Sequence, residues 1–272
     1  MSSVRRVVIR RMNELLTDKN AIIYGGGGSI GGAVARRFAR EGATVFLAGR
    51  TREPLERVAA DIAAAGGRAE VAVLDALDER AVDEHADAVA AQAGGIDVSI
   101  NLVKRGDAQG TPLVGMGVDD YLGAIAAGAR TAFLTARAAA RHMAPRGSGV
   151  ILHLTSASSR GAAPMMGNTG PTDAATEAFH RYLAAELGPQ GVRVVGIHTA
   201  AVRGTLTRES IAEVSGQEVD PEAVYAGLSQ MTMLRRVPEL EQIAATAAFL
   251  ASDGAGAITS GIVNATCGLV AG

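Results

Sequence analysis

Short apolar runs alternate with amphipathic stretches along most of the chain. The apolar runs predict strands at 21–24, 44–48, 68–74, 96–103, 149–155, 192–198 and 261–265. The amphipathic stretches predict helices, of which the longest are 79–93, 121–143, 173–187 and 239–251. Strands that alternate with helices in this way form a mainly parallel sheet with helices on both faces. The sequence therefore predicts a doubly wound α/β fold with about seven strands in a single domain.

Two segments depart from this alternation. Residues 1–18 are rich in arginine and precede the first strand, which predicts an N-terminal arm. Residues 203–236 form short, polar helical pieces with several methionines, a pattern that is more typical of a substrate lid than of a core element. No linker interrupts residues 19–272, so we expect one domain there, with 203–236 as its lid.

A glycine-rich turn separates the first strand from the helix that follows it. Residues 25–28 are all glycine, and Gly31 and Gly32 follow closely. Glycine lets the backbone bend sharply and approach a pyrophosphate, while the helix N-terminus supplies unpaired N–H groups. Val34 and Phe38 share one face of the predicted helix, which argues against a flexible loop. The turn predicts a Rossmann-type dinucleotide site.

The end of the second predicted strand indicates which dinucleotide is bound. A site for NAD usually has Asp or Glu about 20 residues beyond the glycines, where it accepts from the ribose hydroxyls. Here Gly49 stands at that position and Arg50 follows it. A cation without a carboxylate suits a 2′-phosphate, so we expect NADP(H) to be favoured over NAD(H). The alternative is that Arg50 is an ordinary solvated residue at a helix start.

Composition narrows the class of partner. The chain is 48% apolar with a formal net charge of −2, which gives no reason to expect nucleic acid. No uncharged apolar run approaches the length of a membrane span, so we expect small-molecule partners and no membrane. The single cysteine, Cys267, excludes an intramolecular disulfide, suits a cytoplasmic location and is expected to be buried packing. The His and Cys spacing shows no metal motif, so we expect no metal.

Four segments match motifs of one known family. They are 24–31, 74–78, 97–101 and 249–264. The first has the spacing Thr-Gly-x-x-x-Gly-Ile-Gly, although Tyr24 and Ser29 replace two of its residues. The third matches Asp-x-x-x-Asn, although Leu-Val-Lys at 102–104 replaces the usual Asn-Ala-Gly. On these motifs the chain resembles the short-chain dehydrogenase/reductase family from about residue 19 to residue 269.

The resemblance implies an oxidoreductase with a nicotinamide dinucleotide. It also implies a homo-oligomer, a dimer or tetramer, formed through the Ala-rich helices 121–143 and 173–187. The residues that it assigns to dinucleotide binding are Gly25, Gly28, Ser29, Ile30, Gly31, Arg50, Asp75, Ala76, Asn101 and Val202.

The family's catalytic residues are mostly replaced. In the family a Tyr-x-x-x-Lys pair moves the substrate proton and holds the ribose, while a Ser polarises the carbonyl and an Asn assists. Ser156 matches the Ser. Thr169, Asp173 and Gly128 stand at the Tyr, Lys and Asn positions, and no Tyr or Lys occurs in 157–181. The chain is therefore identified as a divergent member that lacks the Tyr-x-x-x-Lys pair.

These replacements change the expected chemistry. A Thr hydroxyl is far less acidic than a phenol, and a general acid typically supplies about 10²–10⁴ in rate. An anion at Asp173 would raise the pKa of a neighbouring acid where the family's cation lowers it, so we expect inverted electrostatics. A further hypothesis is that Asp173 accepts hydrogen bonds from the ribose hydroxyls.

Few residues offer replacement chemistry. Lys104 ends the fourth predicted strand and His198 the sixth, both at the edge where such folds bind ligands. Each also has an ordinary interpretation, as a solvated Lys or a packed His. His153 lies three residues before Ser156, so strand alternation places it on the opposite face and predicts a structural role.

Three functions remain open on the sequence. The first is an NADP(H)-dependent oxidoreductase for an unidentified carbonyl or alcohol substrate, with a non-standard proton relay that uses Ser156 with His198, Lys104 or water. The second is a catalytically silent NADP(H)-binding protein, a sensor or partner subunit. The third is a non-redox lyase, isomerase or cyclase on the same fold. The nearly complete dinucleotide motifs favour the first.

Overall fold

One sheet of seven parallel strands forms the centre of the computed structural model, which describes residues 14–161 and 163–271. In these ranges the strands are β1 (Asn20–Tyr24), β2 (Thr44–Gly49), β3 (Arg68–Val73), β4 (Val98–Asn101), β5 (Gly149–Ser156), β6 (Val192–Thr199) and β7 (Ile262–Asn264). Their order across the sheet is β3-β2-β1-β4-β5-β6-β7. The direction of winding reverses between β1 and β4, so their carboxyl ends flank the crevice where doubly wound folds bind ligands. The predicted doubly wound parallel fold is confirmed.

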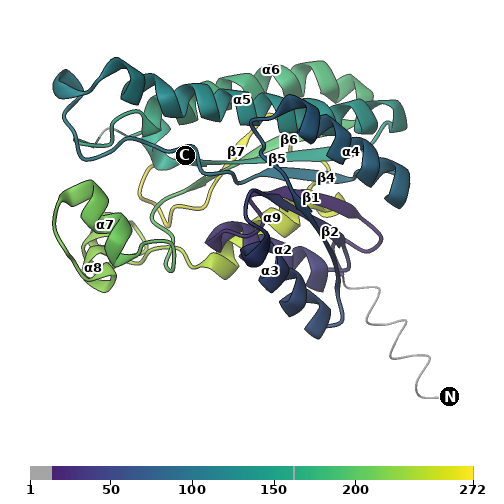
Figure 1. Ribbon diagram of the computed structural model, residues 1–272, viewed down its shortest axis with the longest axis horizontal. Helices are drawn as coiled ribbons and strands as arrows, with labels where there is room; N and C mark the ends of the chain where they lie inside the picture. The colour runs from purple at the N-terminus through teal and green to yellow at the C-terminus, as the bar shows by residue number, and fades with distance from the viewer. Residues whose placement is uncertain (1–13, 162, 272) are drawn as a thin grey trace.

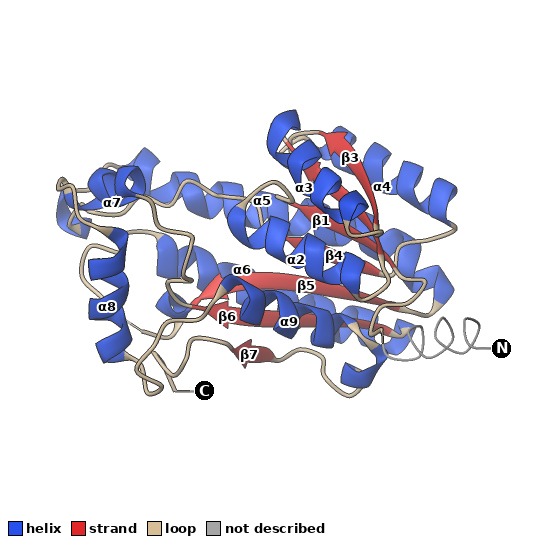
Figure 2. Ribbon diagram, turned by 90° about the horizontal axis from the view of Figure 1, so that it is seen from below, coloured by secondary structure: helices blue, strands red, loops and turns tan. Residues whose placement is uncertain are grey.

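Helices cover both faces of this sheet. On one face lie α2 (Ser29–Arg40), α3 (Arg52–Ala64) and α9 (Leu240–Ala251), and on the other lie α4 (Glu79–Ala93), α5 (Val118–Met143) and α6 (Thr169–Leu187), as Figure 1 shows. Figure 2 shows the same sheet from the α2, α3 and α9 side. Two short helices, α7 (Arg208–Ser215) and α8 (Pro221–Met231), stand apart from both layers.

The strands are apolar on both faces because both faces are covered. In β1, Ala21 and Ile23 pack in the core cluster that includes Phe38 of α2, whereas Ile22 belongs to the cluster that includes Val82 of α4. All five side chains are essentially inaccessible to solvent. This two-sided burial explains why the strands read as continuous apolar runs and not as alternating ones.

Strand β4 is shorter than the predicted 96–103. It ends at Asn101, whose side-chain Oδ1 accepts from the backbone N–H of Val103 at 3.1 Å. This local bond turns the chain away from the sheet. Residues 102–117 then form a long loop, with one 3₁₀ turn at Leu113–Gly115, before α5 begins.

The two unusual segments of the sequence differ in how they are held. Residues 1–13 of the expected arm lie outside the described residues, whereas Leu16 is fully buried and its N–H donates to the Glu41 carbonyl at 2.8 Å. In segment 203–236, the Tyr225 hydroxyl donates to the Val202 carbonyl at 3.0 Å. The same oxygen accepts from the backbone N–H groups of residues 204–206 at 2.9–3.1 Å. Helix α8 is thereby tied to the chain that leaves β6.

Candidate functional site

The glycine turn after β1 is a close-packed cradle. Gly25 has φ +80°, and a Cβ there would lie 2.4 Å from the Leu102 carbonyl oxygen. A Cβ at Gly31 would lie 2.1 Å from the Gly25 carbonyl oxygen. Gly28 caps α2 without a side-chain hydrogen bond, so the N–H groups of the first turn have no partner from a capping side chain. This arrangement suits a phosphate group.

A cavity of about 250 Å³ opens beside this turn, and we call it the dinucleotide cavity. The expected residues that line it are Gly25, Gly28, Arg50, Asp75 and Ala76. Arg52 pairs with Glu56, whereas Arg50 is exposed and has no ion-pair partner among the described residues. The cavity thus combines a glycine cradle with an available cation, an arrangement that suits a ligand bearing phosphate groups.

The remaining expected dinucleotide residues lie around this cavity. Ser29, Ile30 and Gly31 form the first turn of α2, directly after the cradle. Asn101 borders the neighbouring cavity, and its side-chain nitrogen donates to Thr131 Oγ1 at 3.3 Å. Val202 is buried three residues beyond the end of β6 and borders neither of these cavities.

A second cavity of about 390 Å³, here called the inner cavity, adjoins the first. The two share the walls formed by 102–104 and Thr131. Ser156, Asp173 and Gly128 all line the inner cavity, so the structure brings these sequence candidates together. Thr169 does not line it.

Asp173 is the centre of a charged network in this cavity. Its side chain is fully buried, and Oδ1 lies 2.5 Å from Nη1 of Arg105. Oδ2 accepts from the Ser156 hydroxyl at 2.6 Å and from the Ser156 N–H at 2.9 Å. A carboxylate out of water requires such donors, because an unpaired buried charge is strongly unfavourable.

Arg105 reaches Asp173 from the loop that follows β4. Its Nε and Nη2 donate to the two carboxylate oxygens of Asp107 at 3.1 and 2.8 Å. Burial lowers the pKa of Arg105, but the hydrogen bonds and negative charges of Asp107 and Asp173 outweigh it, so that this pKa is raised. The guanidinium is therefore a fixed, permanently charged group.

The expectation of inverted electrostatics at Asp173 is wrong. The Arg105 guanidinium lies against this carboxylate and compensates its charge. The hypothesis that Asp173 accepts from ribose hydroxyls also loses its geometric basis, because the side chain is 0% exposed and its oxygens already accept from three donors. Sequence reasoning missed Arg105, since nothing local indicates a partner 68 residues away.

The hydrogen bond from Ser156 to Asp173 determines which way the Ser156 hydroxyl proton points. Its hydroxyl proton is directed to Asp173, and its oxygen accepts from the Ser158 N–H at 3.2 Å. A hydroxyl oriented in this way presents an acceptor, and not a proton, to the rest of the cavity.

Thr169 is sealed beneath residues 105–110, a segment that we call the strap. The Gln109 side-chain nitrogen donates to Thr169 Oγ1 at 2.8 Å, and Thr169 is 4% exposed. The Ala108 N–H donates to the Asn168 side chain at 3.0 Å. Together with the Arg105–Asp173 pair, these bonds fasten the strap along the first turns of α6.

The prediction that His153 faces away from Ser156 is wrong. Both residues line the inner cavity. The His153 ring stacks on His180 of α6 at 3.8 Å between centroids, and Ser156 also bonds to α6 through Asp173. β5 stays paired with β6 as far as Ser156, but its pairing with β4 ends at His153, and a 3₁₀ turn begins directly after Ser156. Simple alternation does not hold at this last residue of the strand.

The three histidines of this region are enclosed. Burial lowers the pKa of His180 to about 4 and holds that of His153 well below its usual range. His198 is buried, and its Nε2 lies 2.7 Å from Glu177 Oε1 and 3.1 Å from Ser159 Oγ. Because both contacts use the same nitrogen, they do not form a relay through the two ring nitrogens.

Lys104 was expected at the carboxyl end of the fourth strand, and it lies three residues beyond the end of β4. It is exposed, borders both cavities and has no ion-pair partner among the described residues. Cys267 is half-buried. Within 14–161 and 163–271, no three His, Cys, Asp or Glu side chains are grouped so that they could hold a metal, and no helix is long and apolar enough to cross a membrane.

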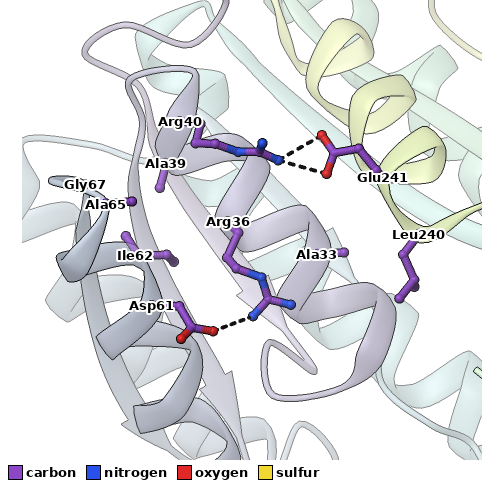
Figure 3. Close-up of a pocket in the computed structure, with 10 residues that line it drawn as sticks. All are labelled: Ala33, Arg36, Ala39, Arg40, Asp61, Ile62, Ala65, Gly67, Leu240 and Glu241. Carbon is purple, nitrogen blue, oxygen red and sulfur yellow. Dashed lines mark hydrogen bonds and ion pairs between the residues drawn. The ribbon is translucent and has the colours of Figure 1, made fainter. Parts of the chain in front are cut away.

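A separate groove of about 450 Å³ lies between α2, α3 and α9, the helices that cover one face of the sheet (Figure 3). Arg36 pairs with Asp61 and Arg40 pairs with Glu241 around it. These guanidinium groups already have carboxylate partners, and no expected site residue lines the groove. Most of the expected site residues line the two cavities at the sheet edge instead.

The chain is similar to several known proteins. The family model described as enoyl-(acyl carrier protein) reductase matches residues 26–270. Oxidoreductase asL5 of Sarocladium schorii is 31% identical over 262 residues, covering 93% of this chain and 96% of that protein. Short-chain reductase protein NovJ of Streptomyces niveus is 31% identical over 249 residues, covering 90% and 91%. The structure of NAD⁺-bound xylitol dehydrogenase is similar with a TM-score of 0.85 and 27% identity, covering 93% of this chain and 99% of that one.

Proposed function

Because this chain belongs to the short-chain dehydrogenase/reductase family, we propose that it is an NADP(H)-dependent oxidoreductase for a carbonyl or alcohol substrate, with a non-standard proton relay. The observation that carries this proposal is the convergence of the glycine cradle, Arg50 and Asp75 on one cavity. That cavity adjoins a second one that contains Ser156. Two adjoining cavities support a model in which one receives the dinucleotide and the other the substrate.

The residues around the cradle fit the dinucleotide. Gly25 and Gly31 leave space that a Cβ would fill, which permits close approach of a pyrophosphate. Gly28, Ser29 and Ile30 offer the N-terminus of α2 to its charge. When bound, the nicotinamide ring supplies the hydride acceptor or donor. The protein residues hold and orient it.

The preference for NADP(H) rests on Arg50. Its guanidinium lines the dinucleotide cavity without a carboxylate partner, and Gly49 leaves no acidic side chain to repel a phosphate. A charge-assisted hydrogen bond to a 2′-phosphate is consistent with this arrangement.

The proton relay differs from that of a Tyr-x-x-x-Lys pair. Thr169 is a weak acid, is buried and bonds to Gln109. Among the groups of the inner cavity that can hold or exchange a proton are Ser156 with Asp173, and the exposed Lys104. We propose that a proton moves through these groups or through water beside them.

A second candidate is a catalytically silent dinucleotide-binding protein. The observation that favours it is that the side chains of Ser156, Thr169 and Asp173 all bond to other groups of the chain. In this alternative the protein senses the cofactor or serves as a partner subunit.

We also propose a cytoplasmic homo-oligomer, a dimer or tetramer. The outer faces of α5 and α6 carry exposed apolar side chains, among them Leu122, Phe133 and Tyr182. Exposed Ala126 and Ala129 complete a stripe at helical spacing on α5. Such a surface is typical of a subunit interface.

Titration with NADPH and NADH tests the proposal. We expect NADPH to bind more tightly, and Arg50→Ala to weaken NADPH by about 10–100-fold while it changes NADH by less than about threefold. Binding of neither nucleotide would contradict the oxidoreductase. NADPH oxidation with a panel of aldehydes and ketones, or NADP⁺ reduction with alcohols, then separates the enzyme from the silent binder.

A further inference from the structure

We propose that Arg105 is a dinucleotide-binding residue, which donates hydrogen bonds to the nicotinamide half of the cofactor from a site prepared by Gly128, Asp107 and Asp173. This inference rests on the proposed dinucleotide function and assigns a residue that comes from the strap and not from α6. It also names the part of the ligand that the inner cavity receives.

The first support is the space at Gly128. A Cβ at this position would lie 2.9 Å from Cδ of Arg105 and 2.6 Å from Cγ2 of Thr172. Any side chain there would therefore push the Arg105 stem away from α5 and α6. The glycine on α5 and the arginine of the strap are a matched pair, since one supplies the space that the other occupies.

The second support is that the guanidinium keeps unused donors. Arginine has five N–H groups. Nε and Nη2 each donate once to Asp107, and Nη1 donates once to Asp173. One N–H on Nη1 and one on Nη2 therefore remain, and the Arg105 side chain is 17% exposed. Both carboxylates fix the orientation of these remaining donors in advance.

The third support is the position of the cavity. It continues from the dinucleotide cavity across the shared wall of 102–104. Arg50 and the glycine cradle belong to the first cavity, whereas Arg105 belongs to the second. A ligand whose phosphates rest on the cradle extends past this wall with its other end, where Arg105 is the partly exposed cation and Asp173 is fully buried.

Two ligands report on different parts of the cofactor site. NADPH has both halves, whereas adenosine 2′,5′-bisphosphate has only the half that fits beside Arg50. The test variant is Arg105→Met with Asp173→Asn, which removes both charges of the fully buried contact together. Asp107 also loses its partner, but its side chain is 22% exposed and remains in contact with solvent. The matched control is Arg146→Met with Asp97→Asn, because Arg146 Nη2 and Asp97 Oδ1 form a 2.9 Å pair at the opposite edge of the sheet.

Calorimetric titration gives the dissociation constants, and circular dichroism checks folding. We expect the test variant to weaken NADPH by about tenfold or more and the bisphosphate by less than about twofold, since only two hydrogen bonds to one half are lost. The control should change neither. Gly128→Ala, which displaces Arg105 without removing its charge, should show the same selective loss and serves if the double variant does not fold.

Two results overturn the proposal. One is an unchanged NADPH affinity in both the double variant and Gly128→Ala. The other is an equal loss for both ligands, which would assign Arg105 a role in the fold alone. Failure of the proposed function is distinguishable, because the wild-type protein would then bind neither ligand.

Discussion

The hydroxyl of Ser156 lies 2.6 Å from Oδ2 of Asp173 and donates its proton to that carboxylate. Because the acceptor is charged and buried, this bond should contribute measurably to stability. We expect Ser156→Ala to lower the free energy of unfolding by about 1.5–3 kcal/mol. Urea unfolding followed by circular dichroism measures the difference. Ser158→Ala is the control, since the Ser158 side chain makes no hydrogen bond among the described residues, and equal midpoints for the two variants would contradict the prediction.

The buried histidines predict a loss of stability in mild acid. The ordinary pKa of 6.5 applies to His180 in the unfolded chain, whereas burial lowers its pKa to about 4 in the folded protein. Below pH 6.5 the unfolded state therefore binds a proton that the folded state does not bind. Stability is fully present above pH 6.5 and falls toward pH 4, with a slope that approaches about 1.4 kcal/mol per pH unit for this residue.

Denaturant unfolding between pH 7 and pH 5 measures this slope. We expect His180→Phe to reduce it, because the titrating group and its proton are removed from both states. His142→Gln, at a half-buried position at the end of α5, is the matched control. An identical slope for wild type and His180→Phe would show that other groups cause the acid sensitivity.

Alanine substitutions at Gly25 and Gly66 distinguish the cost of a positive φ from the cost of a steric clash. Both have φ near +80°, but a Cβ at Gly25 meets the Leu102 carbonyl oxygen at 2.4 Å, whereas nothing lies within 4 Å of one at Gly66. We expect Gly66→Ala to cost about 1 kcal/mol from φ alone and to leave NADPH binding unchanged. Gly25→Ala should cost more and weaken NADPH by about tenfold or more, because the cradle must open. Thermal unfolding and titration of the two proteins measure both effects.

The Tyr225 hydroxyl holds α8 against the chain that leaves β6. Its hydroxyl donates to Val202 and accepts from three backbone N–H groups. Removing it in Tyr225→Phe leaves these groups unpaired in a buried place, which should cost about 1–3 kcal/mol locally. Hydrogen exchange should rise in 203–236 and stay unchanged in β1. Tyr182→Phe is the control, because Tyr182 is 75% exposed, and equal exchange in both variants would contradict this attachment.

Phe133 tests the proposed subunit interface. It is 46% exposed on α5 and lies 5.9 Å from the Phe179 ring of α6. A charge at the centre of an apolar interface is strongly unfavourable, so Phe133→Glu should shift an oligomer toward monomer. Light scattering after size exclusion gives the mass. Phe249→Glu, at a 45% exposed position on α9, is the matched control, and a wild-type monomer would contradict the proposed oligomer.

The fold was predictable because its signals are local. A strand covered on both faces must be apolar throughout, as Ile22 and Ile23 illustrate. The glycine turn is recognisable from its own sequence, although its close contacts come from β2, α3 and the chain after β4. Sequence patterns of this kind need no knowledge of distant partners. Arg50 was expected from its place after the second strand and Asp75 from the family resemblance, and both line one cavity.

The inner cavity was less predictable because its contacts are distant in sequence. Arg105 and Asp173 are in contact although they are 68 residues apart in the sequence. The absence of a side chain at Gly128 is needed only because the Arg105 side chain lies against it. His153 was misplaced because strand alternation was extended to Ser156, the last residue of β5, where pairing with β4 has already ended. The available signals were an acidic residue at 173, a glycine at 128 and a basic residue after β4. Each signal alone is ambiguous, and only the three together indicate a buried ion pair beside a glycine.

The strap also limits which substitutions in α6 can be accommodated. Installing Tyr at 169 and Lys at 173 by substitution in α6 alone would bring the new lysine against Arg105 and the new phenol against Gln109, because both strap residues already occupy these places. Like charges at such a short separation repel one another. The strap, the glycine of α5 and the first turns of α6 therefore form a single module, and a graft that aims to restore the tyrosine chemistry must exchange all three together.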